Sequence, residues 1–195
     1  MSKGLVLSSY EPGCGKLLNA VEEFEARFGR PDYIGGVGLA VPAAVLYAAG
    51  FSRKHISELN SLVAEVNEPT LCAAYFSNAL IQKGLAFARD IETPFCVPVI
   101  DILTKAQFSF TNITEILTCQ YETDLSGSFS LGRVVASAIF GLCEGFEFNG
   151  RVLSAGYRNL DYCANRLKAA GCDRVFCLLD DRYVSCEYCG VTTVY

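Results

Sequence analysis

The stretch GLVLSSYEPGCGKLLNAVEEFEARFGRPDYIGGV, residues 4–37, decides the fold class of this chain. Residues 4–8 form an apolar run of the length of a buried strand, and residues 33–40 form a second one that is rich in glycine. The segment between them ends at Gly29 and Pro31, and its apolar side chains recur at helical spacing: Leu17, Leu18, Val21, Phe24 and Phe28. A strand, a helix and a second strand in this order predict a parallel β–α–β unit.

The remaining sequence continues this alternation and predicts a single α/β domain over residues 1–195. The sheet is expected to be mixed and mostly parallel, with helices packed on it and a C-terminal hairpin after residue 180. A second parallel β–α–β unit is expected over 150–179. In the strand expected over 94–103, Pro98 favours an edge position or a late start of the strand. Apolar spacing and turn residues predict helices over 41–50, 53–66, 69–90, 131–143 and 160–171, and strands over 94–103, 114–122, 150–157 and 173–179.

Composition narrows the class of protein before any motif is considered. Hydrophobic residues make up 51% of the 195 residues and charged residues 19%, which argues against a disordered chain. The net charge of −5, with no basic cluster, argues against a nucleic-acid partner. We find no signal peptide and no apolar run long enough to span a membrane, so we expect a cytoplasmic protein whose ten cysteines are mostly buried thiols.

The turn that joins the first strand to the first helix resembles the phosphate-binding loop of P-loop NTPases. Gly15 and Lys16 match the motif G-x-x-x-x-G-K-[ST], and the strand before them and the helix after them fit its context. Tyr10 stands where the motif has its first glycine, and Leu17 replaces the hydroxyl that holds Mg²⁺. The turn therefore predicts an anion-binding site rather than a nucleotide site.

Cys14 is the best candidate nucleophile in this sequence. It lies between Gly13 and Gly15 at the start of a helix, whereas most other cysteines lie inside apolar runs. The partial positive charge of a helix N-terminus and the nearby Lys16 would both lower the pKa of a thiol. The alternative is that the glycines only permit a tight turn and that Cys14 has no chemical role.

Two later loops precede helices in the same way. Ser126 and Ser128 come before a helix that carries Arg133, and Ser154 and Arg158 follow a strand. If these strands are parallel, their loops meet the first turn at one edge of the sheet. We therefore expect an enzyme that acts on a small anionic metabolite, phosphorylated or carboxylate, with no cofactor identified. Ordinary helix capping by serine is the alternative.

The C-terminal cysteines offer a metal or iron–sulfur site as a second hypothesis. Cys186 and Cys189 form a C-x-x-C pair, and Cys172 could supply a further ligand. With His55 as the single histidine, a histidine-rich site is excluded, and its place in the first turn of a helix favours a solvated side chain.

A third hypothesis is a non-enzymatic subunit of a homo-oligomeric assembly. The segments 41–50 and 69–88 are apolar on most sides, and a low charge content is typical of helices that are buried between subunits.

Two cysteine-bearing segments resemble the halves of the aspartate/glutamate racemase superfamily: TLCAAYFSNA with VPVIDI, and NRLKAAGCDRVFCLL. The resemblance implies that Cys72 and Cys177 act as paired thiols on opposite faces of a substrate α-carbon. The family has Asn-Thr after the first cysteine, where Ala73 and Ala74 stand here, and Thr after the second, where Leu178 stands.

Overall fold

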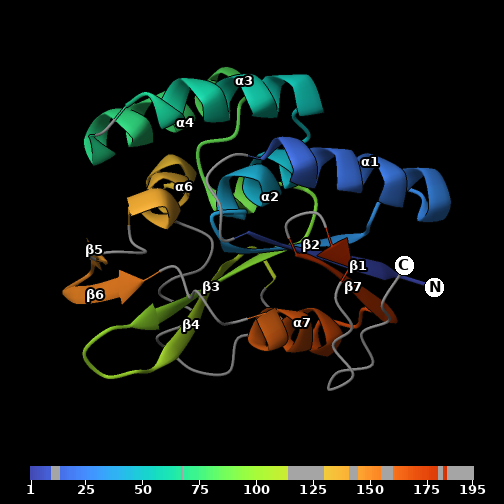
Figure 1. Ribbon diagram of the computed structural model, residues 1–195. Helices are drawn as coiled ribbons and strands as arrows, with labels where there is room; N and C mark the ends of the chain where they lie inside the picture. Colours follow the sequence, from blue (N-terminus) through green and yellow to red (C-terminus); the bar gives the residue numbers. More distant parts are fainter. Residues whose placement is uncertain are drawn as a thin grey trace.

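A computed structural model describes residues 1–9, 14–66, 68–113, 130–140, 145–154, 160–179 and 182–183. Within these ranges the strands form one mixed sheet in the order β5–β6–β3–β2–β1–β7–β8, and β4 pairs with β3 (Figure 1). The strands are β1 (Lys3–Ser9), β2 (Tyr33–Gly38), β3 (Phe95–Asp101), β4 (Gln107–Thr111), β5 (Phe146–Phe148), β6 (Arg151–Ser154), β7 (Arg174–Leu179) and β8 (Arg182–Tyr183). The helices are α1 (Gly15–Phe28), α2 (Val41–Ala48), α3 (Arg53–Ala64), α4 (Pro69–Gln82), the short 3₁₀ turn η1 (Ala88–Asp90), α6 (Leu131–Phe140) and α7 (Leu160–Ala169).

The four central strands β3, β2, β1 and β7 are parallel, which confirms the predicted α/β class and the unit at 4–37. Helix α1 ends where the sequence predicts, because Gly29 adopts a left-handed φ of 75° that closes the last turn. The C-terminal hairpin is also confirmed, since β8 pairs antiparallel with β7. The predicted strand at 114–122 lies outside the described residues.

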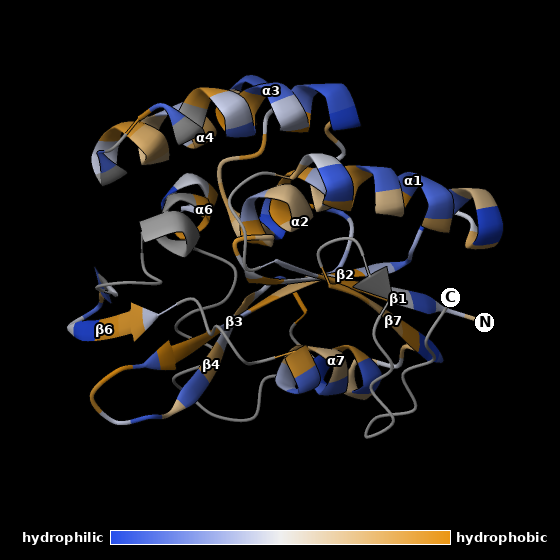
Figure 2. Cartoon of the chain, in the orientation of Figure 1, coloured by the Kyte–Doolittle hydropathy of each residue, from blue (hydrophilic) through white to orange (hydrophobic). Residues whose placement is uncertain are grey.

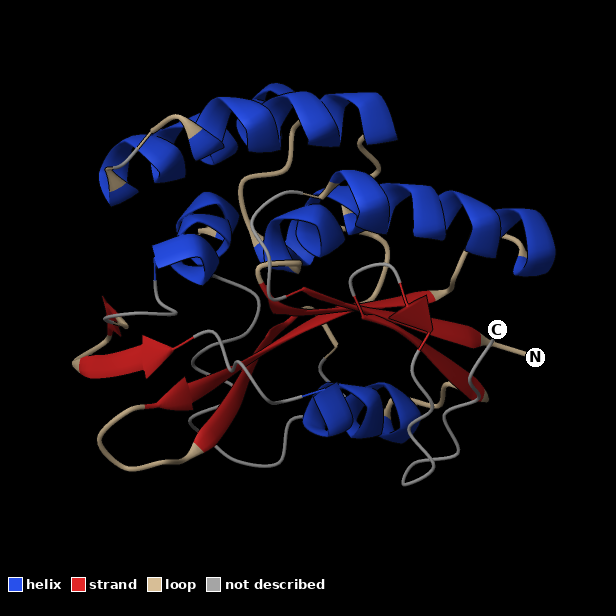
Figure 3. Cartoon of the chain, viewed as in Figure 1, coloured by secondary structure: helices blue, strands red, loops and turns tan. Residues whose placement is uncertain are grey.

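Helices cover both faces of the sheet, and a separate apolar core fills each side. Figure 3 shows α7 alone on one face and the other α-helices on the opposite face, with α3 and α4 outermost. Figure 2 shows hydrophobic residues along the strands that lie between them. On the α1 side, the ring of Phe176 lies 5.1 Å from that of Phe24 and 4.8 Å from that of Phe28. On the α7 side, Cys96, Cys163 and Cys177 pack with small aliphatic residues.

The two apolar helices differ from the sequence-based prediction. Every residue of α2 is buried within the monomer, so its apolar character needs no second subunit. The helix expected over 69–90 ends at Gln82, because Gly84 has a φ of 80° and the chain turns back. Both segments were expected to be buried between subunits. Of the two helices, only α4 has apolar side chains that are exposed on the monomer.

The second half of the sheet departs further from the predicted topology. Strand β6 runs antiparallel to β3, so the expected parallel unit at 150–179 is wrong. Strand β3 is central rather than at an edge, with β2, β4 and β6 as neighbours. Its pairing with β2 stops at Cys96 and its pairing with β6 begins at Ile100, which leaves Pro98 in a gap where no N–H donor is needed.

Among the helices described above, none combines the length and the apolar character that crossing a membrane requires.

Candidate functional site

The parallel strands end together at one edge of the sheet, which we call the carboxyl edge and define by Ser9, Gly38, Asp101 and Leu179. From β1 the chain passes to β2 and then β3 on one side, and it later places β7 on the other side of β1. The strand order therefore reverses between β1 and β7. In open α/β sheets, this reversal creates the crevice in which ligands bind. Helix α1 begins directly beyond the end of β1 at this point.

The N-terminus of α1 is not capped by the residue that occupies the capping position. Cys14 stands there, its side chain makes no capping hydrogen bond, and the first turn of the helix has no acidic residue. Helix α4 begins differently, because the carboxylate of Glu68 accepts hydrogen bonds from Thr70 N at 2.9 Å and Leu71 N at 2.6 Å. The start of α4 therefore has a carboxylate from its own sequence. The capping residue and first turn of α1 contain no such anion.

The Cys14 thiol is buried, which corrects the expectation of an exposed and activated cysteine. Cys14 is 7% exposed and packs in the core between the sheet and the helices on its α1 face. Burial raises the pKa of Cys14 above its ordinary value, although a hydrogen bond with the Asn60 side chain and the local backbone act in the opposite direction. Burial therefore outweighs the hydrogen bonds that lower the pKa of Cys14. A nucleophilic role for Cys14 remains a prediction.

We expect iodoacetamide to modify Cys14 in the native protein more slowly than it modifies free cysteine near neutral pH. The thiolate is the reacting species, and both burial and the raised pKa reduce its availability. Mass spectrometry of peptides after timed alkylation between pH 7 and 10 measures the rate, with the urea-unfolded protein as the control. A rate of modification that is already high at pH 7, and that does not rise at higher pH, would show an activated thiolate and contradict the structure.

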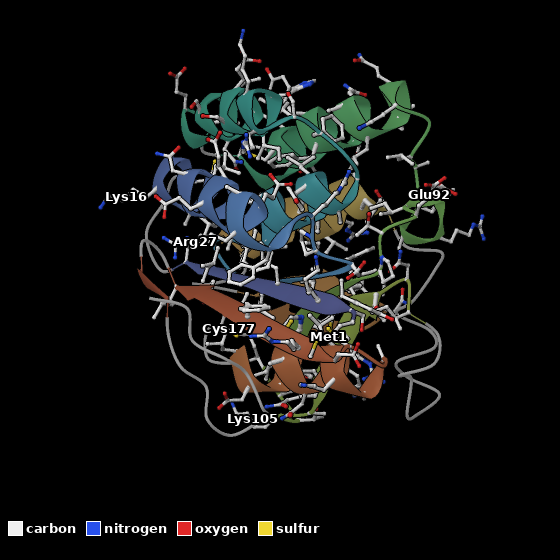
Figure 4. All side chains as sticks on the ribbon, turned by 90° about the vertical axis from the view of Figure 1, so that its right-hand side faces the viewer. Met1, Lys16, Arg27, Glu92, Lys105 and Cys177 are labelled. Atoms are coloured by element: carbon white, nitrogen blue, oxygen red, sulfur yellow. The ribbon has the colours of Figure 1, made fainter. Side chains whose placement is uncertain are left out.

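Gly15 and Lys16 occupy the first turn of α1. A Cβ atom added to Gly15 would meet no atom within 4 Å, so the described chain leaves open space there. Lys16 is exposed, and Figure 4 shows its side chain projecting outward from α1, away from the sheet. Gly13 lies outside the described residues. The turn keeps a glycine and a cation at the start of α1.

The other predicted binding residues are only partly brought together. Ser154 ends β6 beside Ile100, close to the carboxyl edge, although its strand is antiparallel rather than parallel as assumed. Arg133 is exposed on α6 and its Nη2 donates to the carbonyl of Glu147 at 3.1 Å, which ties α6 to β5. Ser126, Ser128 and Arg158 lie outside the described residues, so convergence of the three loops stays a prediction.

Ser8 is a buried residue of the carboxyl edge that the sequence analysis missed. It is fully buried, and its hydroxyl has no hydrogen-bond partner among the residues that the structure describes. Alternation along β1 places Ser8 on the same face as Val6, toward α7. A buried hydroxyl normally has a partner, so Ser8 marks a position where a further polar group fits. The sequence signal was available, since Ser8 interrupts an apolar strand just before the turn.

Asp101 has a structural role at the same edge. Its Oδ1 accepts hydrogen bonds from Leu103 N at 2.9 Å and Thr104 N at 3.3 Å, which holds the turn between β3 and β4. Burial would raise the pKa of Asp101, but these hydrogen bonds outweigh it and lower the pKa. The carboxylate therefore stays ionised and engaged in the turn.

Three hollows in the described part of the chain lie away from α1's first turn. The largest of these, about 500 Å³, adjoins the starts of β2 and β3 and is lined by Tyr33 and Asn112. A second, about 270 Å³, lies between α3 and α4, where the exposed His55 packs edge-on against Phe51 at 5.1 Å. A third, about 300 Å³, contains Arg30 and Lys83 beside the end of α2. None was predicted from the sequence.

The metal hypothesis rests on cysteines that are only partly described. Cys172 is buried, and its Sγ donates to the carbonyl of Arg174 at 3.1 Å, while Cys186 and Cys189 lie outside the described residues. Within the residues that the structure describes, no group of three or more His, Cys, Asp or Glu side chains is arranged to hold a metal ion.

Comparison with known proteins gives no assignment: no protein-family model matches the chain, and no curated protein matches it significantly. The racemase resemblance also fails on geometry. Cys72 belongs to the core above the sheet, whereas Cys177 belongs to the core on the α7 face, between β7 and α7 in Figure 4. The sheet separates these two thiols, so they cannot act on opposite faces of one carbon atom.

Proposed function

We propose that this protein binds a small anionic metabolite, phosphorylated or carboxylate, at the first turn of α1 on the carboxyl edge, and acts on it as an enzyme. The observation that carries the proposal is the start of α1, which has no cap from Cys14 and no acidic residue in its first turn, at the point where the strand order reverses. The first N–H groups of a helix have no partner within the helix and carry a partial positive charge. Phosphate and carboxylate groups bind such a terminus readily.

Neighbouring residues support an anionic ligand at this position. The open space at Gly15 allows a ligand to approach the backbone, and Lys16 contributes a positive charge to the same turn. In this proposal Gly13 and Gly15 supply backbone donors, while Ser126, Ser128, Arg133, Ser154 and Arg158 contact the remainder of the metabolite.

The described cysteines support a reducing compartment for this reaction. All six described cysteines are free thiols, even though several of them lie in the same apolar core. Disulfides are rare in the cytosol and common outside it. We therefore propose a cytoplasmic metabolite as the ligand, with Cys14 as an anchor of the α1 turn or, if it is ever deprotonated there, as the nucleophile.

Gly15→Asp is expected to weaken anion binding at least about fivefold, because a carboxylate placed within about 4 Å of a bound anion repels it by roughly 1 to 4 kcal/mol. The same carboxylate interacts favourably with the start of the helix, so stability is retained. Isothermal titration with inorganic phosphate measures the affinity, and ¹⁵N chemical shifts of residues 15–17 locate the binding.

Gly15→Asn is the matched control, since it has the size of aspartate without its charge, and we expect it to bind phosphate nearly as well as the unmodified protein. The proposal fails if phosphate leaves the amide shifts of the first turn of α1 unchanged. It also fails if both variants bind with the same affinity.

A further inference from the structure

The exposed face of α4 carries a regular, uncharged stripe of side chains. Leu71 is 45% exposed and Ile81 is 58% exposed, and Ala74 and Asn78 lie exposed between them. The intervals of three, four and three residues place all four on one side of the helix, in the spacing of the core positions of a coiled coil. No residue of α4 is charged. This combination is typical of a helix that packs against another helix.

The stripe is not used by the folded monomer. The opposite side of α4 already contributes Cys72, Phe76 and Leu80 to the core. A third side packs closely against α6, where a Cβ on Gly132 would approach Ser77 N to 2.5 Å. Since α4 belongs to the outermost helix layer, its remaining face is directed away from the sheet (Figure 1). The apolar stripe is therefore available to a partner.

Asn78 narrows the chemistry of that partner. An amide that is buried against an apolar surface loses its hydrogen bonds to water and must find new ones. Asparagine at a single core position of a helix pair is satisfied by asparagine in the other helix, and it fixes the register of the two. A second copy of this chain supplies that amide, and it also places Leu71 against Leu71 and Ile81 against Ile81.

Charge and area restrict where a second copy can bind. Each chain carries a net charge of −5, so two copies repel each other over most of their surfaces, and the uncharged face of α4 is where they can approach. A helix of 14 residues is about 21 Å long, which is short for a standard interface of roughly 800 Å² per partner. Helix α3 extends the surface, because Leu62 in the same outer layer is 42% exposed.

We propose that the protein forms a two-fold dimer through the outer layer of α3 and α4, with Asn78 facing Asn78 of the second copy. The interface buries the stripe on α4 and Leu62 on α3 in a layer of four helices. Its moderate size predicts a dimer that forms at micromolar concentrations. This inference does not depend on the proposed anion site, which lies at the carboxyl edge.

Light scattering after size-exclusion chromatography tests the dimer, with the full chain kept reduced at tens of micromolar. The unmodified protein is expected at twice the mass of one chain. Ile81→Glu is expected at the mass of one chain, because it buries a carboxylate in each half of the interface. Leu103→Glu adds the same charge at an apolar residue that is 76% exposed in the turn between β3 and β4, outside the α3 and α4 layer, and is expected to remain dimeric. A monomeric unmodified protein, or a dimeric Ile81→Glu variant, overturns the proposal.

A charge exchange tests which residues face each other. Asn78→Asp and Asn78→Lys are each expected to be monomeric, and an equimolar mixture is expected to form a mixed dimer in which Asp faces Lys. A mixture that stays monomeric overturns the placement of Asn78 against itself. Circular dichroism of each variant confirms that it is folded, so a loss of mass reports the interface alone.

Discussion

Gly132→Ala is expected to destabilise the protein by about 3 kcal/mol, the upper part of the range for forcing a methyl group into a packed site. A Cβ atom at this position would lie 2.5 Å from Ser77 N and 2.7 Å from Ser77 Cα, so α6 and α4 would have to separate. Backbone atoms cannot rotate away as the end of a side chain can. The midpoint of urea unfolding, followed by circular dichroism, measures the loss.

Gly15→Ala is the matched control, because a Cβ at Gly15 meets no atom within 4 Å and alanine favours the helix. A second variant separates the clash with the side chain from the clash with the backbone. Ser77→Ala removes the Oγ atom that a Cβ at Gly132 would approach most closely, yet it leaves the backbone of α4 in place. We therefore expect Ser77→Ala to rescue Gly132→Ala only slightly. Full rescue would show that the helix backbones are not in close contact.

Alkaline pH is expected to destabilise the protein strongly, because several buried groups are held in their neutral form. Burial is the main cause that raises the pKa of Cys14, Cys72 and Tyr47, and it raises that of Cys172 to about 11. For Cys163 the hydrogen bond with Cys96 is the largest cause and burial the second.

The sign follows from the protons that each state binds. Well below pH 9 the thiols are protonated in both states, so their contribution to stability is complete there. Above pH 9 an unfolded thiol ionises while a buried one does not, so the free energy of unfolding falls as pH rises. For Cys172, a change from its ordinary pKa of 9.0 to about 11 corresponds to about 3 kcal/mol, lost progressively up to pH 11.

Urea unfolding at intervals from pH 7 to pH 11, in the presence of a reductant, measures this dependence. Cys172→Ala loses some packing but is expected to show a shallower fall between pH 9 and pH 11. An unfolding midpoint that stays constant over this interval would mean that the thiols ionise equally in both states, contrary to their burial.

The sequence predicted the elements whose signals are local and agree with one another. Residues 4–37 contain a clear strand, an amphipathic helix and a glycine stop, and the structure confirms all three. The start of α3 is equally local, since the hydroxyl of Ser52 accepts a hydrogen bond from His55 N at 3.2 Å. The C-terminal hairpin was also predicted, from a polar turn between two extended segments.

The hairpin between β5 and β6 shows a local signal that was present and overlooked. Asn149 and Gly150 form its turn, with φ values of 48° and 73°, the left-handed pair that favours a two-residue hairpin. An Asn-Gly pair between two short apolar runs predicts this turn. Recognising it would have made β6 the second strand of a hairpin and removed the assumption that it starts a parallel unit.

The candidate site likewise has features that local sequence predicts and features that depend on tertiary packing. A strand, a glycine turn and a helix in sequence predict an anion-binding terminus, and this binding stays a prediction. The state of Cys14 could not be predicted, because it depends on burial in the tertiary core and on a hydrogen bond with Asn60, which lies far along the chain. The burial of the Ser8 hydroxyl likewise depends on tertiary structure, because β1 lies between β2 and β7.

The sequence by itself determined the α/β class and the central parallel unit, because periodicity and turn chemistry act over a few residues. Only the tertiary structure decided which thiols are buried and that β3 is central despite Pro98. It also decided that α2 is fully buried within the monomer, while α4 has an exposed apolar face. These outcomes depend on desolvation and steric contact between segments distant in the chain. The opening turn GCGK predicts an anion-binding terminus by its local sequence, and burial in the core decides that its cysteine is a protected thiol.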